Sequence, residues 1–190
     1  MPESNRSIYF ATGNKHKFDE AKDILKNYNI KVIMIRKKAE EIQSDDLKKI
    51  ARHALLKALE SCKSPIIVED AGLFVKTLKG FPGPYSSYVH RTLGIDGIIE
   101  LIKNKSGREA EFRSVVAYGD SSMIKTFEGV VKGMVILRPR GISGFGFDPI
   151  FIPRGLRRTF AEMTLKEKNK YSHRAIALRE FAEWYLGSHL

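Results

Sequence analysis

Residues 65–73 read PIIVEDAGL, an apolar run that stops at two acids. The run after Pro65 is rich in β-branched residues, which predicts a buried β-strand. Glu69, Asp70 and two small residues follow, so we expect the strand to end there. Ligands of open α/β sheets bind beyond the carboxyl ends of strands, and carboxylates suit Mg²⁺ or Mn²⁺. The stretch predicts either a metal site or an acidic turn in water.

The composition is that of one folded domain. The 190 residues are 43% hydrophobic and 10% aromatic, which allows a sizeable core and is unlike a disordered chain. No apolar run approaches the roughly 18 residues of a membrane span, and we expect no signal segment. Cys62 is the only cysteine, which excludes an internal disulfide and a cysteine metal cluster. A cytoplasmic protein without membrane contact is therefore expected.

The formal net charge is +11 at pH 7. This charge fits two kinds of partner: a nucleic acid, or small polyphosphates bound at individual sites on a basic protein. Lys and Arg recur along the whole chain and do not gather in one tail. The charge alone therefore favours neither partner.

A turn near the N-terminus has the features of a phosphate site. Residues 7–11 are expected to form a strand that the sequence TGN at 12–14 ends, and an amphipathic helix follows. Asn14 is the expected N-cap, which leaves free N–H groups at the helix start. Lys15 and Lys17 lie in the first turn, where positive side chains are unfavourable unless an anion is present. A chance turn with solvated lysines is the alternative.

The remaining pattern predicts one α/β domain over residues 1–190. Strands and helices alternate up to about residue 105, and two strands of a hairpin are expected at 109–118 and 123–137. We interpret this change to antiparallel β-structure, at about 106–140, as a second lobe inserted into the same domain.

Two stretches in the last third of the chain invite a ligand. Residues 141–151 read GISGFGFDPIF, a glycine-rich loop that could bring backbone and rings close to a planar ligand. The alternative is a hairpin with core aromatics. His173 and Arg174 then begin the last expected helix, where a cationic pair is most easily explained by a ligand that accepts hydrogen bonds.

The motifs, taken in this order, closely resemble the inosine triphosphate pyrophosphatase (Ham1-like) family. The resemblance spans about residues 8–184. The segments that carry it are TGN at 12–14 with Lys17 and Glu20, EDAGL at 69–73, FPGPYS at 81–86, FGFDPIF at 145–151, AEM at 161–163, Lys168 with Asn169, and SHR at 172–174.

The resemblance implies a two-lobed α/β fold, with a long mixed β-sheet flanked by helices and an active-site cleft between the lobes. It implies Mg²⁺-dependent hydrolysis of ITP, dITP and XTP to the nucleoside monophosphate and pyrophosphate, which cleanses the nucleotide pool. It also implies a homodimer, and it argues against nucleic acid as a partner.

The resemblance makes Asp70 the general base and a metal ligand, although the sequence leaves open whether Asp70 only holds the metal. It makes Glu41 the second metal carboxylate, a role that Glu40 could take instead. Ala71 stands where many members carry serine, so a hydroxyl contact is lost while the backbone N–H remains. The implied substrate-binding residues are Thr12, Gly13, Asn14, Lys15, His16 and Lys17 for the phosphates, Ala71, and Phe145, Gly146, Phe147, Asp148, Lys168, His173 and Arg174 for the base.

Two other functions stay open at this point. One is a basic RNA- or DNA-binding module without catalysis, which would bind oligonucleotides in a salt-sensitive way. The other is a pyrophosphatase for a different nucleotide, such as dUTP or a modified pyrimidine.

Overall fold

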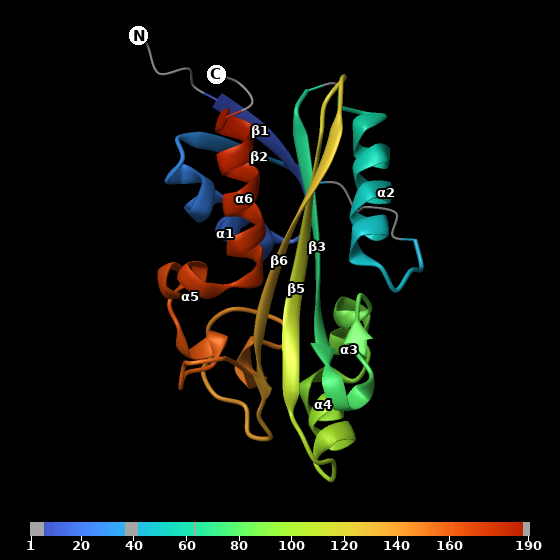
Figure 1. The fold of residues 1–190 in the computed structure, drawn as a ribbon, viewed down its shortest axis with the longest axis vertical. Coiled ribbons are helices and arrows are strands. Elements are labelled where there is room, and N and C mark those ends of the chain that lie inside the picture. The colour runs from blue at the N-terminus through green and yellow to red at the C-terminus, as the bar shows by residue number, and fades with distance from the viewer. Residues whose placement is uncertain (1–5, 37–41, 63, 188–190) are drawn as a thin grey trace. The chain divides into compact units, whose positions relative to one another are not determined.

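The computed structural model describes residues 6–36, 42–62 and 64–187 and has the expected mixed α/β fold (Figure 1). Its strands are β1 (Arg6–Ala11), β2 (Ile30–Ile35), β3 (Ile66–Val75), β4 (Pro82–Gly83), β5 (Glu109–Gly119), β6 (Ile124–Val135) and β7 (Phe151–Pro153). Its helices are α1 (Lys15–Lys26), α2 (Leu47–Leu59), α3 (Ser86–Thr92), α4 (Gly94–Ile102), α5 (Leu165–Tyr171) and α6 (His173–Gly187), with short 3₁₀ helices η1 (Lys76–Leu78), η2 (Asp148–Ile150) and η3 (Phe160–Glu162). Within the described residues the strands form a seven-stranded mixed sheet in the order β2-β1-β3-β5-β6-β7, and β4 pairs with β3 off this path.

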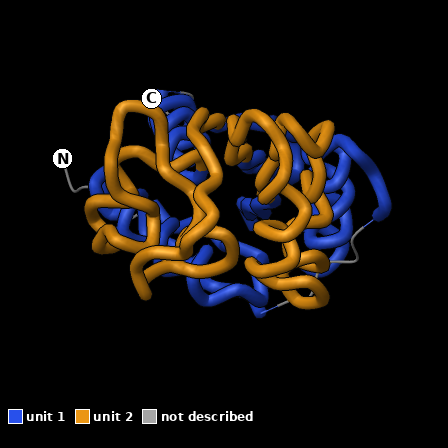
Figure 2. The backbone as a smooth tube through the Cα atoms, turned by 90° about the horizontal axis from the view of Figure 1, so that it is seen from below, with its two compact units in different colours: residues 1–70, 114–129, 174–190 blue, residues 71–113, 130–173 orange. Residues whose placement is uncertain are grey.

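The chain forms two compact units, each built from separate segments (Figure 2). The first contains residues 1–70, 114–129 and 174–190, and the second contains 71–113 and 130–173. Residues 114–129 of the lobe expected at about 106–140 belong to the first unit, and the rest of it belongs to the second, together with α3, α4, α5 and the glycine-rich loop. The expected cleft between two lobes stays a prediction.

Parallel strands form the centre of the first unit. β1 pairs with β2 from Arg6 opposite Ile30 to Ala11 opposite Ile35, and it pairs in parallel with β3 at Tyr9 and Phe10. Parallel neighbours need a crossover connection, which α1 provides between β1 and β2. Figure 1 shows α1 and α6 on one face of these strands and α2 on the other.

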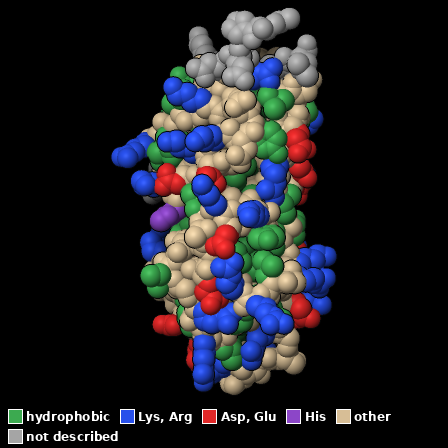
Figure 3. All heavy atoms as spheres, turned by 90° about the vertical axis from the view of Figure 1, so that its left-hand side faces the viewer, with side chains coloured by type: hydrophobic (Ala, Val, Ile, Leu, Met, Phe, Trp, Pro, Cys, Tyr) green, Lys and Arg blue, Asp and Glu red, His purple; other side chains and the backbone are tan. Residues whose placement is uncertain are grey.

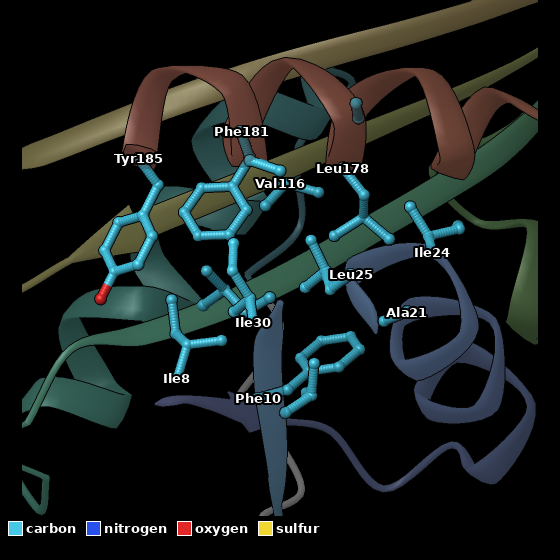
Figure 4. Packing of buried hydrophobic residues seen from close by; sticks show 14 of the residues in the cluster. Ile8, Phe10, Ala21, Ile24, Leu25, Ile30, Val116, Leu178, Phe181 and Tyr185 are labelled. Atoms are coloured by element: carbon cyan, nitrogen blue, oxygen red, sulfur yellow. The ribbon is translucent and has the colours of Figure 1, made fainter. Parts of the chain in front are cut away.

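The core of the first unit lies between the strands and helices α1 and α6 (Figure 4). Ile8 and Phe10 occupy alternate positions of β1 and are completely buried, and Leu25 of α1 and Phe181 of α6 pack in the same cluster. Burying each such side chain contributes about 1.5–3 kcal/mol. This packing fixes where β1 ends and α1 begins, which is where the phosphate site was expected.

The expected end of the third strand is wrong. β3 continues through Glu69, Asp70 and the small residues as far as Val75, and its last part pairs with β4, with Leu73 opposite Gly83. Gly72 is needed for this pairing, because a Cβ at Gly72 would lie 2.1 Å from the carbonyl oxygen of Gly83. The small residues therefore serve a close approach of two strands and not a turn, so both acids lie within a strand.

The other expected elements agree with the structure. Asp46 caps α2, because its carboxylate accepts a hydrogen bond from the backbone N–H of Lys48 at 2.8 Å. β5 and β6 form the expected hairpin. No helix in the described part of the chain has both the length and the apolar character that crossing a membrane requires.

Replacing Gly72 by alanine should destabilise the protein. The added Cβ would clash with a backbone carbonyl that is held in a strand pair, so we expect a loss of about 1–3 kcal/mol. The measurement is the midpoint of thermal unfolding. The matched control is Gly187→Ala at the end of α6, where an added Cβ meets no atom within 4 Å. Equal midpoints for the two variants would contradict the close approach of β3 and β4.

Candidate functional site

The turn between β1 and α1 is held by its own polar side chains. The Asn14 side chain accepts hydrogen bonds from the backbone N–H groups of His16 and Lys17 at 2.9 and 3.2 Å, which confirms it as the N-cap. The hydroxyl of Thr12 accepts from the N–H of Asn14 at 3.1 Å. Gly13 is exposed, and a Cβ there would meet nothing within 4 Å. The turn therefore presents backbone at the positive end of a helix, as a phosphate site requires.

The two lysines of this turn point to different partners. Lys15 forms an exposed ion pair with Asp19, one turn further along α1. Lys17 reaches β3, where its Nζ lies 3.0 Å from Oε2 of Glu69 and 3.9 Å from Oδ1 of Asp70. It also donates a hydrogen bond to the backbone oxygen of Glu69 at 3.2 Å. Lys17 thus joins the turn between β1 and α1 to both acids of β3.

Arg174 completes a chain of alternating charges. Its Nη1 donates to a carboxylate oxygen of Glu20, and its Nε lies 3.1 Å from Oε1 of Glu69. Ser114 donates from its hydroxyl to the same Oε1 at 2.5 Å. Glu20, Arg174 and Glu69 are almost completely buried. We call Glu20, Arg174, Glu69 and Lys17 the buried charge network.

The network keeps Glu69 and Arg174 ionised. Burial by itself raises the pKa of Glu69, but Arg174, Lys17 and the Ser114 hydroxyl outweigh it and hold the pKa well below its usual range. Burial lowers the pKa of Arg174, and the two carboxylates more than offset that, so its pKa is raised. Glu69 and Arg174 are therefore both charged at neutral pH, and each depends on the other for part of its counter-charge.

The positions of Arg174 and Glu20 were not foreseen. The sequence placed Arg174 among base-binding residues, whereas its guanidinium faces two buried carboxylates. Its contact with a base stays a prediction. Sequence reasoning gave Glu20 no role, although a glutamate beside Ala21 on the buried stripe of α1 is a signal that a buried cation must meet it.

The glycine-rich loop of the second unit is organised by Asp148. Its Oδ2 accepts hydrogen bonds from the backbone N–H of Phe145 at 2.9 Å and from Nζ of Lys168 at 2.5 Å. Gly144 has a φ of +74°, and a Cβ there would lie 2.2 Å from the same oxygen. Lys168 Nζ also lies 4.8 Å from the centroid of the Phe145 ring. The structure therefore brings together three residues of the expected base-binding set.

The other expected substrate-binding residues of the second unit lie in three places. Gly146 and Phe147 belong to this loop, His173 begins α6, and Ala71 lies in β3. Phe147 is buried, with its ring edge-on to His90 at 5.3 Å, and Gly146 adopts a φ of +62°. His173 is buried and stacks on Phe112 with ring centroids 4.6 Å apart. Ala71 is half-buried within β3.

Among the described residues, Asp70 could bind Mg²⁺ only together with further ligands. Asp70 is partly buried, with its side chain 20% exposed, and none of the residues that the structure describes form a cluster of three or more His, Cys, Asp or Glu side chains suited to a metal ion. Glu40 and Glu41 lie outside the described residues. Mg²⁺ is commonly held by one or two carboxylates together with waters and substrate phosphates. Asp70 fits that donor class.

Surface charge does not single out one patch on the face in Figure 3. Lys and Arg side chains are spread over this face among acidic and hydrophobic ones. The arrangement gives no stripe of the kind that follows a nucleic-acid backbone. On this face the structure therefore adds nothing in favour of a nucleic-acid partner.

The sequence matches the model of the Ham1 family over residues 8–184. The dITP/XTP pyrophosphatase of Saccharolobus solfataricus is 50% identical over 173 residues, covering 91% of this chain and 90% of the relative. The dITP/XTP pyrophosphatase of Methanopyrus kandleri is 49% identical over 179 residues, covering 94% of this chain and 95% of the relative. Among solved structures, the Ham1 protein of Staphylococcus aureus has a TM-score of 0.83 at 28% identity, covering 96% of this chain and 100% of that chain.

Replacing Arg174 by methionine should destabilise the protein strongly. Methionine keeps most of the side-chain length but leaves Glu20 and Glu69 buried without their cation. Breaking a buried ion pair in this way costs about 3–5 kcal/mol. The measurement is the free energy of unfolding from urea titration followed by circular dichroism.

The control for this variant is Lys48→Met, which breaks the ion pair between Lys48 and Glu128. Both of those side chains are about half exposed, at 46% and 53%, and an exposed pair contributes about 1 kcal/mol or less. If Arg174→Met cost no more than Lys48→Met, the network would not stabilise the fold.

Proposed function

The chain belongs to the Ham1 family, as its motifs predicted, and we propose that it hydrolyses dITP, ITP and XTP to the monophosphate and pyrophosphate. The observation that carries this proposal is the position of Lys17. Its ammonium lies in the first turn of α1, 3.0 Å from Glu69 and 3.9 Å from Asp70. A lysine held between a phosphate-binding turn and a carboxylate that remains partly accessible suits hydrolysis of a phosphoanhydride. Relatives named dITP/XTP pyrophosphatase support the choice of substrate.

The first turn of α1 supplies positive charge for a triphosphate. A triphosphate carries about four negative charges near neutral pH, which repel an attacking water. The first turn reads KHKF and contains no acid, so the helix start and Lys17 both favour a bound anion. Charge stabilisation by groups already in place is usually a large part of catalysis. We infer that these groups bind the phosphates and stabilise the leaving pyrophosphate.

Asp70 is the proposed catalytic residue. A carboxylate can accept a proton from water or orient it for attack. We also propose that Asp70, with Glu41 or Glu40, holds Mg²⁺, which when bound would neutralise phosphate charge. Lys17 Nζ lies 3.9 Å from Oδ1 of Asp70 and places a positive charge beside the carboxylate.

We propose that the expected base-binding residues, among them His173 and Phe145, contact the purine base. Hypoxanthine and xanthine carry an oxygen at position six, which donors such as His173 can satisfy. Adenine carries an amino group there, so a buried donor would be left unpaired at a cost of about 1–3 kcal/mol. Stacking on Phe145 would add affinity for any purine without discrimination. GTP shares the oxygen at position six, so its rejection needs other contacts.

We further propose that the protein is a homodimer and acts in the cytoplasm, as the family resemblance implies. Light scattering on the purified protein tests the first part. A mass of about twice that of one chain is expected, and a mass of one chain would contradict it.

The function is tested by product analysis with a panel of triphosphates. ITP should yield IMP and pyrophosphate in the presence of Mg²⁺, and activity should disappear when EDTA removes the metal. IDP with orthophosphate, or a preference for dUTP, would contradict the proposal. Salt-sensitive oligonucleotide binding without any hydrolysis would favour the nucleic-acid-binding alternative.

Asp70→Asn should lower the rate of ITP hydrolysis by about 10²–10⁴-fold, the usual effect of losing an acid–base group. The amide has nearly the same shape, so the thermal midpoint should stay near that of the wild type. The matched control is Asp19→Asn, which removes an exposed acid of the same helix that carries Lys17 and should leave the rate unchanged. Near wild-type turnover in folded Asp70→Asn would remove Asp70 from the mechanism.

A further inference from the structure

A cluster of aromatic side chains in the second unit lies next to two of the expected base-binding residues, His173 and Lys168. Phe112 of β5, Phe151 of β7 and Phe160 of η3 are buried. Phe112 packs edge-on to Phe151 with ring centroids 4.7 Å apart, and Phe151 lies 5.4 Å from Phe160. Phe160 lies 6.0 Å from the Phe112 ring as well, so the three rings form one cluster.

His173 lies flat on the Phe112 ring. The ring centroids are 4.6 Å apart and the planes differ by only 8°. Both nitrogens of an imidazole direct their hydrogen bonds within the ring plane. Fixing that plane on Phe112 therefore fixes the plane in which His173 can donate or accept.

The same cluster reaches the second polar group of the base-binding set. Lys168 Nζ lies 5.5 Å from the Phe160 ring centroid and 4.8 Å from that of Phe145, within the range of cation–π attraction. Phe160 also lies 6.4 Å from the His173 ring. One connected set of rings thus contacts both His173 and Lys168.

A purely structural role for these rings is the alternative. A core needs only apolar volume, and leucine or methionine supplies it with modest loss when the volume is similar. A flat ring is needed only where it fixes the orientation of a second ring stacked on it. The nearly parallel stack on His173 is such a place, and the edge-on contact with Phe151 is not.

We propose that Phe112 is a positioning residue for recognition of the purine base, acting through the imidazole of His173. This inference rests on the proposed function, because it takes His173 as a base contact. It adds a determinant of specificity that the sequence motifs did not contain. Phe112 itself is not a catalytic residue.

The test is a double-mutant cycle on the full-length protein with ITP and ATP as substrates. Phe112→Leu should raise KM for ITP roughly two- to tenfold, the loss expected for one aromatic pair, while kcat changes little. In a His173→Gln background the same replacement should change KM less than twofold, because the group that Phe112 positions is gone. Phe112→Met is the second variant and should raise KM in the same way. The flexible methionine side chain fills irregular space, so this variant guards against a loss of folding in Phe112→Leu.

Phe151→Leu is the matched control, because it makes the same change in the same cluster. It should lower the thermal midpoint but leave KM for ITP unchanged. An equal rise of KM in Phe151→Leu, or an equal effect of Phe112→Leu in both backgrounds, would overturn the inference. If the wild type did not hydrolyse ITP, the proposed function would fail instead.

A measurement on the wild type needs a variant only to assign its signals. The carbon-bound imidazole protons of His173 should resonate upfield of their usual position in proton NMR, because they lie over the face of Phe112. Comparison with His173→Gln identifies these signals. Ordinary chemical shifts for both protons would overturn the stacked arrangement.

Discussion

Arg174 is almost completely buried, with its guanidinium between the carboxylates of Glu20 and Glu69. Burying an isolated charge is costly, and burying a pair is tolerable only with good geometry and further hydrogen bonds. Glu69 meets this condition, because its carboxylate forms ion pairs with Arg174 and Lys17 and accepts a hydrogen bond from the hydroxyl of Ser114. The remaining features of the first unit's site are positioned by this set of contacts.

The network connects elements that are distant in the sequence. Lys17 and Glu20 lie three residues apart on α1 and therefore on neighbouring positions of one helix face. Glu69 lies on β3 and Arg174 in the first turn of α6. The turn between β1 and α1 and the strand that carries Asp70 are thus held together by buried ion pairs and by the packing of α1 and α6 on the strands. A site on rigid elements positions its groups more accurately than one on loops.

Local chemistry was predictable and long-range pairing was not. The cap at Asn14 follows from residue type and position alone, and the hairpin was predicted at 109–118 and 123–137, around the turn residues at 119–121. The end of β3 was mispredicted because Gly72 is required by the close approach of the β4 backbone. That contact comes from a different part of the chain, and no local pattern reveals it. Asp148 and Lys168 were assigned to one ligand site, but nothing in their spacing shows that they pair with each other.

The loss of folding stability at acidic pH tests the buried charge network most directly. The pKa of Glu69 is lower in the folded protein than its ordinary value of 4.5, despite the opposing effect of burial. A carboxyl group of this kind stabilises the fold above its unfolded pKa and loses that contribution as the pH falls. The measurement is the free energy of unfolding of the wild type and of Glu69→Gln between about pH 5 and pH 3. The wild type should lose stability more steeply than the variant as the pH falls, and parallel curves would contradict the network.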